Sequence, residues 1–268
     1  MVFAKKSLGQ HFLTSEKALR SIVTSAQLSA EDVVLEIGPG RGALTLPLLH
    51  TGAQVIAIEK DADMVSHLET QCAEWLDSGS LVLIKGDVRA LDSDTLTALI
   101  PHRKYKIVAN IPYYITGEIM RQFLTIDPQP QSMTLLVQKE VAERIARDKK
   151  ESILSLSVKV YGSPHYIETV PAGAFNPPPS VDSAILHISN LSKSVFEEIS
   201  ESDFFAVVKT GFSSRRKQLR VNLRNKYTQE SIDAMLSACR LRTDVRAEDI
   251  PCQTWVQMVE HLKEKRVY

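Results

Sequence analysis

The sequence predicts an α/β fold followed by a small, all-helical domain. In the first two-thirds of the chain, short apolar runs rich in β-branched residues alternate with segments of helical spacing. After residue 190 these runs stop, and polar helical segments take their place. Strands that alternate with helices build parallel crossover units, with helices on both faces of one sheet. We therefore expect an α/β domain over residues 1–190 and a helical domain over residues 191–268.

The expected elements follow from the positions of these runs. Strands are predicted at 33–38, 54–59, 81–87, 105–110 and 132–138, and helices at 43–50, 62–76, 116–124 and 140–147. Two further runs, 165–170 and 183–188, have no helix between them, so we expect an antiparallel pair at one sheet edge. In the second domain, helices are predicted at 195–199, 203–212, 215–224, 229–238, 247–249 and 253–265.

Composition and cysteine use exclude several classes of protein. Apolar residues make up 44% of the chain and charged residues 24%, which excludes wholesale disorder. No run approaches 18 apolar residues, so we expect no membrane-spanning helix, and the first residues lack the apolar core of a secretory signal. Three widely spaced cysteines without a CxxC pair indicate reduced thiols, a cytoplasmic location and no structural metal.

Charge is unevenly distributed although the chain is neutral, with 32 basic and 32 acidic residues. Residues 1–189 carry 18 basic and 21 acidic side chains, whereas residues 190–268 carry 14 and 11. The segment 209–226 holds seven basic residues and no acidic one. A helix over 215–224 would place positions 216, 220 and 224 on one face, which suits RNA phosphates, although such a run can also be a solvated helix face. The candidate RNA-binding residues are Arg215, Arg216, Lys217, Arg220 and Arg224.

Polar residues and a glycine loop fall at the ends of successive predicted strands. Gly38 and Gly40 follow the first strand and allow a sharp turn with close approach of a ligand. Glu59 ends the second strand, where a carboxylate can accept hydrogen bonds from two ribose hydroxyls. Asp87 ends the third strand and could bind an adenine amino group, and Asn110 ends the fourth. A glycine cluster alone indicates only a tight turn, but this combination favours a cofactor that contains a nucleoside.

Two cofactors fit the strand-end pattern. Gly38-x-Gly40-x-x-Ala43 satisfies the dinucleotide fingerprint, so NAD has to be considered. S-adenosylmethionine (SAM) also carries an adenosine but has no pyrophosphate. The segment Asn110-Ile111-Pro112-Tyr113 offers a polar acceptor, a stiff carbonyl and a stacking face, which suits an amine on a flat ring. It could also be a capped turn with a packing tyrosine.

Five segments in order resemble a known family. They read KKSLGQHFL (5–13), EIGPGRG (36–42), NIPY (110–113), AFNPPPSVDS (174–183) and FSSRRKQLR (212–220). The chain resembles the ribosomal RNA adenine dimethyltransferases, in particular the bacterial small-subunit branch linked to kasugamycin sensitivity. Large-subunit methyltransferases of erythromycin resistance share the catalytic core, but the basic segment and the proline-rich loop favour the small-subunit branch. The resemblance implies a Rossmann-like class I SAM-dependent methyltransferase sheet.

The resemblance also implies roles for residues around the cofactor. Glu59 would hold the SAM ribose, and Asp87 with the Val88 backbone would hold its adenine. Gly38 and Gly40 would pass beneath the methionine part. From the N-terminal segment, His11 and Leu13 would cover the cofactor.

At the target base, the resemblance implies that Asn110 and Pro112 grip the adenine amine, while Tyr113 and Phe175 stack on its ring. Asn110 would also touch the cofactor. The implied substrate is 16S rRNA in the small ribosomal subunit, modified by a monomer without a metal during ribosome biogenesis. A non-catalytic rRNA-binding assembly factor is the alternative, and an NAD-dependent oxidoreductase is a distant third.

Overall fold

The computed structural model describes residues 5, 9–101 and 104–263. The chain forms two compact units, one of residues 1–142 with 163–191 and one of residues 143–162 with 192–268. The division after residue 191 lies next to the expected domain boundary, but residues 143–162, which the sequence analysis assigned to the first domain, belong to the helical unit. Among the described residues, no helix is both long and apolar enough to cross a membrane.

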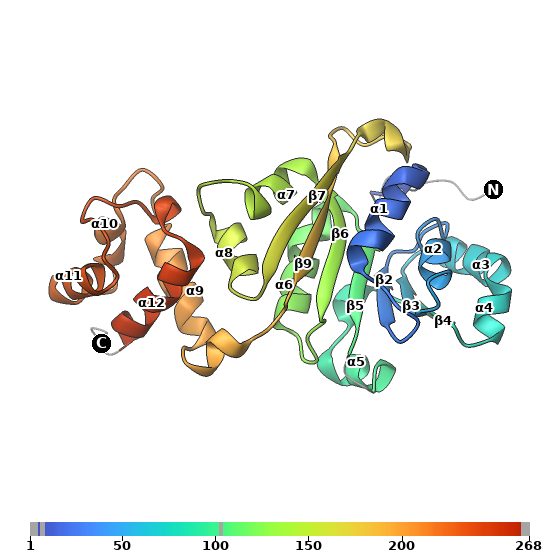
Figure 1. Cartoon of the computed structure of the whole chain (residues 1–268), viewed down its shortest axis with the longest axis horizontal. Coiled ribbons are helices and arrows are strands. Elements are labelled where there is room, and N and C mark those ends of the chain that lie inside the picture. The colour runs from blue at the N-terminus through green and yellow to red at the C-terminus, as the bar shows by residue number, and fades with distance from the viewer. Residues whose placement is uncertain (1–4, 6–8, 102–103, 264–268) are drawn as a thin grey trace. The chain divides into compact units, whose positions relative to one another are not determined.

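The first unit contains a seven-stranded sheet in the order β4-β3-β2-β5-β6-β9-β7, with the strands labelled in Figure 1. Its strands are β2 (Val33–Ile37), β3 (Gln54–Glu59), β4 (Leu81–Lys85), β5 (Lys106–Asn110), β6 (Ser132–Gln138), β7 (Ser163–Val170) and β9 (Ser183–Ser189). The five strands from β4 to β6 are parallel, and β9 pairs antiparallel with both β6 and β7. The predicted fold class, with an antiparallel pair at one edge, is confirmed.

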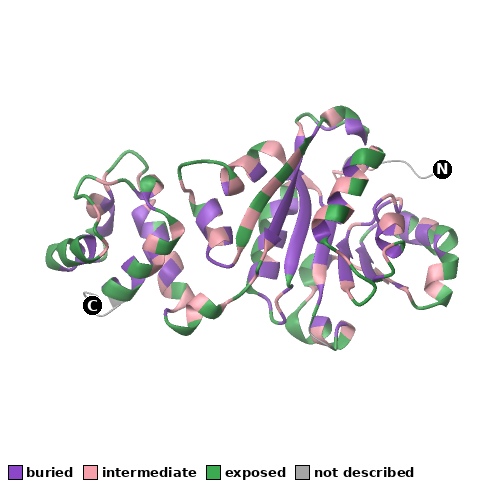
Figure 2. Cartoon of the chain, in the orientation of Figure 1, coloured by how far each residue is buried: buried purple, intermediate pink, exposed green. Residues whose placement is uncertain are grey.

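Burial explains why the strands could be predicted from the sequence. Every residue from Val34 to Ile37 and from Val55 to Glu59 is buried, as is β6 from Ser132 to Val137. Figure 2 shows the central strands in purple, that is, buried. Such strands are covered on both faces and therefore have nearly continuous apolar sequences. The edge strand β7 instead alternates between exposed and half-buried residues.

The helices of this unit are only partly those expected. They are α1 (Glu16–Ala26), α2 (Thr45–Leu49), α3 (Ala62–Gln71), α4 (Ala73–Asp77), α5 (Ser93–Leu99) and α6 (Thr116–Thr125), with short 3₁₀ turns η2 (Val88–Ala90), η3 (Tyr113–Ile115) and η4 (Ala172–Ala174). The helix predicted over 62–76 is two helices, because Cys72 (φ −111°, ψ 22°) ends α3 and begins α4. Helices α1 and α5 were not predicted.

A two-stranded ribbon ties the N-terminal segment to a distant loop. Strand β1 (Phe12–Leu13) pairs antiparallel with β8 (Phe175–Asn176), so that Leu13 lies opposite Phe175. The backbone N–H of Thr14 donates to the carbonyl of Ala174 at 2.8 Å. Residues about 160 positions apart in the sequence therefore lie side by side.

The second unit is helical. Its elements are α7 (Lys139–Ala146), which begins in the first unit, α8 (Ile153–Lys159), η5 (Ser194–Glu197), α9 (Glu201–Gly211), α10 (Leu219–Leu223), α11 (Gln229–Ala238), η6 (Ala247–Asp249) and α12 (Cys252–Lys263). Residues 143–162 join this unit through hydrogen bonds. The Glu151 N–H donates to the Glu248 carbonyl at 2.7 Å, and the Tyr161 hydroxyl donates to Glu201 at 2.7 Å. At its core Phe212 stacks on Trp255, with ring centroids 5.6 Å apart.

The prediction of a helix over 215–224 is wrong for residues 215–218. Only Leu219–Leu223 form a helix, and residues 215–217 lie in a turn. The side-chain amide of Asn222 donates to the Gly211 carbonyl at 2.5 Å and to the Ser214 carbonyl at 3.0 Å, which holds the intervening chain as a loop. Arg216, Arg220 and Arg224 therefore do not share one helical face, because tertiary hydrogen bonds override the local spacing.

Candidate cofactor and target-base site

A pocket opens at the carboxyl ends of β2, β3, β4 and β5 in the first unit. The carboxyl ends of parallel strands are where open α/β sheets bind ligands. Its lining includes every residue that the sequence analysis assigned to the cofactor or the target base, namely His11, Leu13, Gly38, Gly40, Glu59, Asp87, Val88, Asn110, Pro112, Tyr113 and Phe175. Lys6, Ser7 and Leu8 of the N-terminal motif lie outside the described residues.

The glycine loop after β2 lies against the pocket with left-handed backbone. Gly38 has φ +67° and Gly40 has φ +56°, conformations that favour glycine. A Cβ placed on Gly38 would meet no atom within 4 Å, so a side chain there would project into space that a ligand can use. A Cβ on Gly40 would lie 3.1 Å from the Phe12 ring, which shows how closely the N-terminal segment covers the loop.

Glu59 is fixed at the rim by backbone donors. Its Oε2 accepts the N–H of Gly40 at 3.0 Å, and its Oε1 accepts the N–H of Asp61 at 2.8 Å. Glu59 is buried, with only 6% of the residue exposed. Burial raises the pKa of Glu59, and the N–H groups of Asp61 and Gly40 oppose that rise. Each oxygen keeps a second lone pair, so the carboxylate can still accept hydrogen bonds from a ligand.

Asp87 is held by two cations that the sequence analysis missed. Its Oδ1 accepts Arg89 Nε at 3.0 Å, and its Oδ2 lies 3.1 Å from Lys60 Nζ. The Arg89 guanidinium holds the pKa of Asp87 well below its usual range, so this carboxylate stays ionised. The carboxylate also caps η2 by accepting the Arg89 N–H. Next to it, the Val88 carbonyl accepts Gln122 Nε2 at 2.9 Å, which fixes the neighbouring backbone.

Asn110 and Tyr113 are oriented by contacts with other segments. Asn110 Nδ2 donates to the His11 carbonyl at 3.3 Å, so Oδ1 is the amide atom left to accept from a ligand. The Tyr113 hydroxyl lies 2.6 Å from Ser183 Oγ. Burial raises the pKa of Tyr113, which keeps its hydroxyl neutral. The rings of His11 and Tyr113 stack with centroids 6.3 Å apart and an interplanar angle of 20°.

A buried carboxyl, Glu36, also lines the pocket and was not singled out from the sequence. It is 1% exposed, and its Oε2 makes no hydrogen bond with any residue that the structure describes. Burial raises the pKa of Glu36 to about 8. Glu36 lines the same pocket as Gly38, and its unsatisfied Oε2 leaves this buried carboxyl able to form a hydrogen bond with a ligand.

Replacing Glu36 with glutamine should flatten the pH dependence of stability in the ligand-free protein. Between pH 4.5 and about 8 the folded chain keeps a proton that the unfolded chain has released. The free energy of unfolding therefore falls as pH rises, by at most ~1.4 kcal/mol per pH unit. Glu36→Gln removes this contribution, and urea unfolding at pH 5, 6, 7 and 8 measures it. Exposed Glu31 provides the control, since Glu31→Gln should leave the slope unchanged. If Glu36→Gln left the slope of unfolding free energy against pH unaltered, the raised pKa of Glu36 would be contradicted.

The candidate RNA-binding residues lie in the second unit. Arg215, Arg216 and Lys217 are exposed, and within the described part of the chain none of them forms an ion pair. The Arg220 and Arg224 guanidinium groups donate to neutral amides, Gln218 Oε1 at 3.0 Å and Gln229 Oε1 at 2.6 Å. None of these five cations forms an ion pair in the described part of the chain, although Arg220 lies close enough to Asp244 to help lower the pKa of that carboxyl. No group of three or more potential metal ligands was found among the described residues.

Comparison with known proteins gives the family. The family model described as ribosomal RNA adenine dimethylase matches residues 1–264. The chain belongs to the ribosomal RNA adenine dimethylase family. This membership confirms the family predicted from the five sequence segments and the assignment as an enzyme, an rRNA adenine dimethyltransferase. It also decides against the NAD-dependent oxidoreductase.

Named relatives of this dimethylase match over nearly the whole chain. It is 38% identical to the ribosomal RNA small subunit methyltransferase A of Dehalococcoides mccartyi over 256 residues, 94% of this chain and 86% of that one. It is also 38% identical to the protein of the same name from Trichormus variabilis, over 98% of this chain and 99% of that one.

Solved structures share the fold of the dimethylase. The 23S rRNA methyltransferase ErmE matches with a TM-score of 0.74 and 24% identity, over 94% of this chain and 99% of that one. A dimethyladenosine transferase from Plasmodium falciparum matches with a TM-score of 0.76 and 23% identity, over 96% and 100%. Both confirm the class I methyltransferase fold expected from the sequence.

Proposed function

We propose that this dimethylase transfers methyl groups from SAM to the exocyclic amine of adenines in small-subunit (16S) rRNA during ribosome biogenesis. The observation that carries the proposal is one pocket in which Glu59 and Asp87 lie on the same rim as Asn110 and Tyr113. The first pair suits an adenosine, and the second pair suits a flat ring bearing an amine. The named relatives, which are small-subunit methyltransferases, support the choice of rRNA.

The residues of the pocket divide between cofactor and target. Glu59 would bind the ribose hydroxyls, Asp87 with the Val88 backbone would bind the adenine, and Gly38 would leave room for the methionine part. SAM would supply a methyl group bound to a positively charged sulfur, and this sulfur is a good leaving group. Glu36, a further residue of the pocket lining, would add a hydrogen-bonding group.

At the target base, the protein's task is to change the geometry of an amine. The lone pair of an adenine amine is delocalised into the ring, which makes it a poor nucleophile. Asn110 Oδ1 and the carbonyl of Ile111 or Pro112 would accept its two hydrogens and favour a tetrahedral nitrogen. Tyr113 would stack on the ring and offset the stacking lost in the RNA, by ~1–3 kcal/mol per base. Orienting the reactants in this way can supply roughly 7–11 kcal/mol.

We further propose that the second unit docks the enzyme on rRNA through Arg215, Arg216, Lys217, Arg220 and Arg224, and that the enzyme acts as a cytoplasmic monomer. The three cysteines are free thiols, which supports a reducing compartment. The exposed cations belong to a different unit from the pocket, so RNA binding and chemistry can be lost separately. That separation would also let the enzyme serve a second, non-catalytic role in ribosome assembly.

Transfer of tritium from labelled SAM to small ribosomal subunits that lack the modification tests the proposal. We expect labelled N6,N6-dimethyladenosine after digestion to nucleosides, with two methyl groups per fully modified base. Large subunits treated in parallel should stay unlabelled. Binding of the small subunit without any transfer would favour the assembly role, and labelling confined to large subunits would overturn the choice of substrate.

Replacing Glu59 with alanine should weaken SAM binding. The change removes two acceptors for the ribose hydroxyls and the anchor for the Gly40 and Asp61 N–H groups. We expect a loss of about 1–3 kcal/mol in binding free energy, measured by calorimetry on protein whose fold is checked by circular dichroism. Glu16→Ala, at an exposed position of α1, is the matched control. Equal SAM affinity in the folded Glu59 variant and the wild type would refute the ribose assignment.

A further inference from the structure

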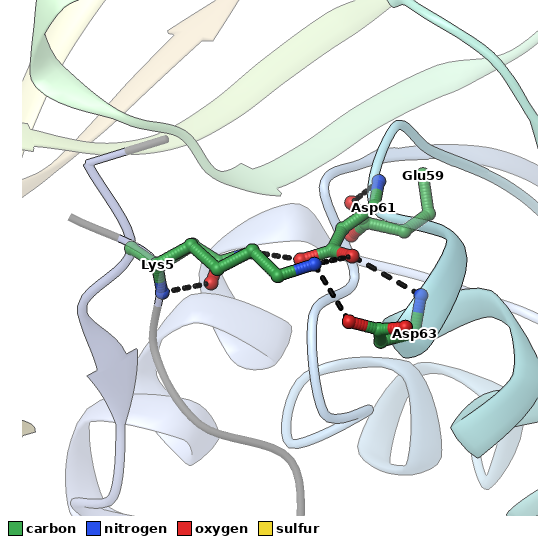
Figure 3. Close-up of polar contacts among 5 residues, drawn as sticks. Lys5, Glu59, Asp61 and Asp63 are labelled. Atoms are coloured by element: carbon green, nitrogen blue, oxygen red, sulfur yellow. Dashed lines mark hydrogen bonds and ion pairs between the residues drawn. The ribbon is translucent and has the colours of Figure 1, made fainter. Parts of the chain in front are cut away.

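Lys5 reaches from the N-terminal segment to the beginning of α3, as Figure 3 shows. Its Nζ lies 2.6 Å from Asp61 Oδ1 and 2.7 Å from Asp63 Oδ2. The Lys5 N–H donates to Gln10 Oε1 at 2.8 Å, and Gln10 Nε2 donates to Asp61 Oδ2 at 3.2 Å. Both oxygens of the Asp61 carboxylate are thus held by residues of the N-terminal segment.

Asp61 connects this cluster directly to the cofactor rim. Its backbone N–H donates to Glu59 Oε1 at 2.8 Å, while its carboxylate caps α3 by accepting the Asp63 N–H at 3.1 Å. A chain of contacts therefore runs from Lys5 through Asp61 to Glu59 Oε1, at a residue that lines the pocket.

Burial distinguishes this ion pair from an ordinary surface contact. Exposed ion pairs contribute little, with a median of about 0–1 kcal/mol. The Asp61 side chain is only 1% exposed, so loss of its cation would leave a buried carboxylate with less compensation. Three carboxylates, Glu59, Asp61 and Asp63, occur within five residues, and the neighbouring cation Lys60 pairs with Asp87 instead. Among the residues that the structure describes, Lys5 is thus the cation paired with Asp61 and Asp63.

We propose that Lys5 is a positioning residue for the cofactor: by holding Asp61 it fixes the backbone N–H that orients the Glu59 carboxylate toward the ribose. This inference rests on the proposed function, because it assigns the ribose to Glu59. Lys5 itself does not line the pocket, so its effect on affinity passes through Glu59 rather than through contact with the ligand.

A double-mutant cycle between Lys5 and Glu59 tests the proposal, with S-adenosylhomocysteine binding measured by calorimetry. Lys5→Gln alone should weaken binding three- to tenfold. In the Glu59→Ala background the same change should weaken binding by less than twofold, because the group through which Lys5 acts is gone. Lys5→Arg should restore affinity to near the wild-type value.

A ligand that lacks the relevant hydroxyl gives an independent readout. With the 2′-deoxy analogue of S-adenosylhomocysteine, the loss caused by Lys5→Gln should shrink, which a general structural role would not produce. Lys17→Gln serves as the control, since Lys17 is an exposed lysine near the N-terminus that also forms an ion pair, 3.5 Å from Glu168.

The outcomes separate this inference from the proposed function. Equal losses from Lys5→Gln in the wild-type and Glu59→Ala backgrounds would overturn it, as would unchanged affinity in Lys5→Gln while Glu59→Ala loses affinity. In both cases the proposed function would stand. Failure of the wild-type protein to bind S-adenosylhomocysteine or SAM would instead contradict the proposed function itself.

Discussion

Replacing Asn110 with alanine should lower the single-turnover rate of methyl transfer on the order of 100-fold, the effect of losing one preorganised polar group in an active site. The Asn110 amide is oriented by the protein itself, because its Nδ2 donates to the His11 carbonyl at 3.3 Å. That contact leaves Oδ1 as the acceptor for an amine hydrogen, so alanine removes an interaction that strengthens as the nitrogen becomes tetrahedral. The rate is measured with saturating SAM and small subunits that lack the modification.

The same substitution also removes a hydrogen bond that holds the N-terminal segment, and a control has to separate the two effects. Thr14→Val removes a comparable bond of that segment, from Thr14 Oγ1 to the Ala174 carbonyl at 3.0 Å, at a residue outside the pocket lining. We expect Thr14→Val to keep most of the rate and Asn110→Ala to keep normal RNA affinity. A rate near the wild-type value for Asn110→Ala would refute its role in the transfer step.

The sheet could be predicted because its signal is local. Residues 55–59 and 132–137 are all buried, and burial on both faces favours a nearly continuous apolar run. Helix α1 gave a weaker signal, since its fully buried positions are Ala18, Ile22 and Ala26, two of which are small residues. The pairing of Leu13 with Phe175 could not be predicted from local pattern, because it depends on how the whole unit folds.

The pocket was predictable to the extent that parallel strands bring their ends together. Glu59, Asp87 and Asn110 each end or follow a strand, so the topology alone gathers them. The contacts that orient them were not predictable in the same way. Lys5 pairs with Asp61, 56 positions away in the sequence, and Lys60 pairs with Asp87, 27 positions away. Such pairings depend on tertiary structure.

The basic segment shows a tertiary contact overriding a local pattern. Four-residue spacing of Arg216, Arg220 and Arg224 predicted a single helical stripe, yet residues 215–217 form an exposed turn ahead of α10. The three cations of this turn form no ion pair in the described structure, so the expected attraction to phosphate is unchanged. Only its geometry differs, with three adjacent charges on a turn in place of a stripe along a helix.

Neutralising that turn should therefore weaken small-subunit binding and its salt dependence together. For the triple variant Arg215→Gln, Arg216→Gln, Lys217→Gln, each lost phosphate contact should reduce the log–log salt slope by roughly 0.7–0.9, or about 2–3 in all. At 0.1 M salt, this reduction of the slope corresponds to small-subunit binding that is weaker by on the order of 100-fold. SAM affinity should not change, because the turn and the pocket belong to different units.

The matched control neutralises cations of the same unit that already have acidic partners. Lys150 pairs with Glu248 and Arg242 pairs with Asp244, so Lys150→Gln, Arg242→Gln should change the salt slope far less than the triple variant does. Binding measured between 50 and 300 mM salt distinguishes the two sets. Equal slopes for the triple variant and the wild type would mean that rRNA docks elsewhere, whereas equal losses in both variants would indicate that total charge, and not the turn, governs binding. A selective loss in the triple variant would place the docking contact at residues 215–217, because these three cations alone would then account for the released counterions.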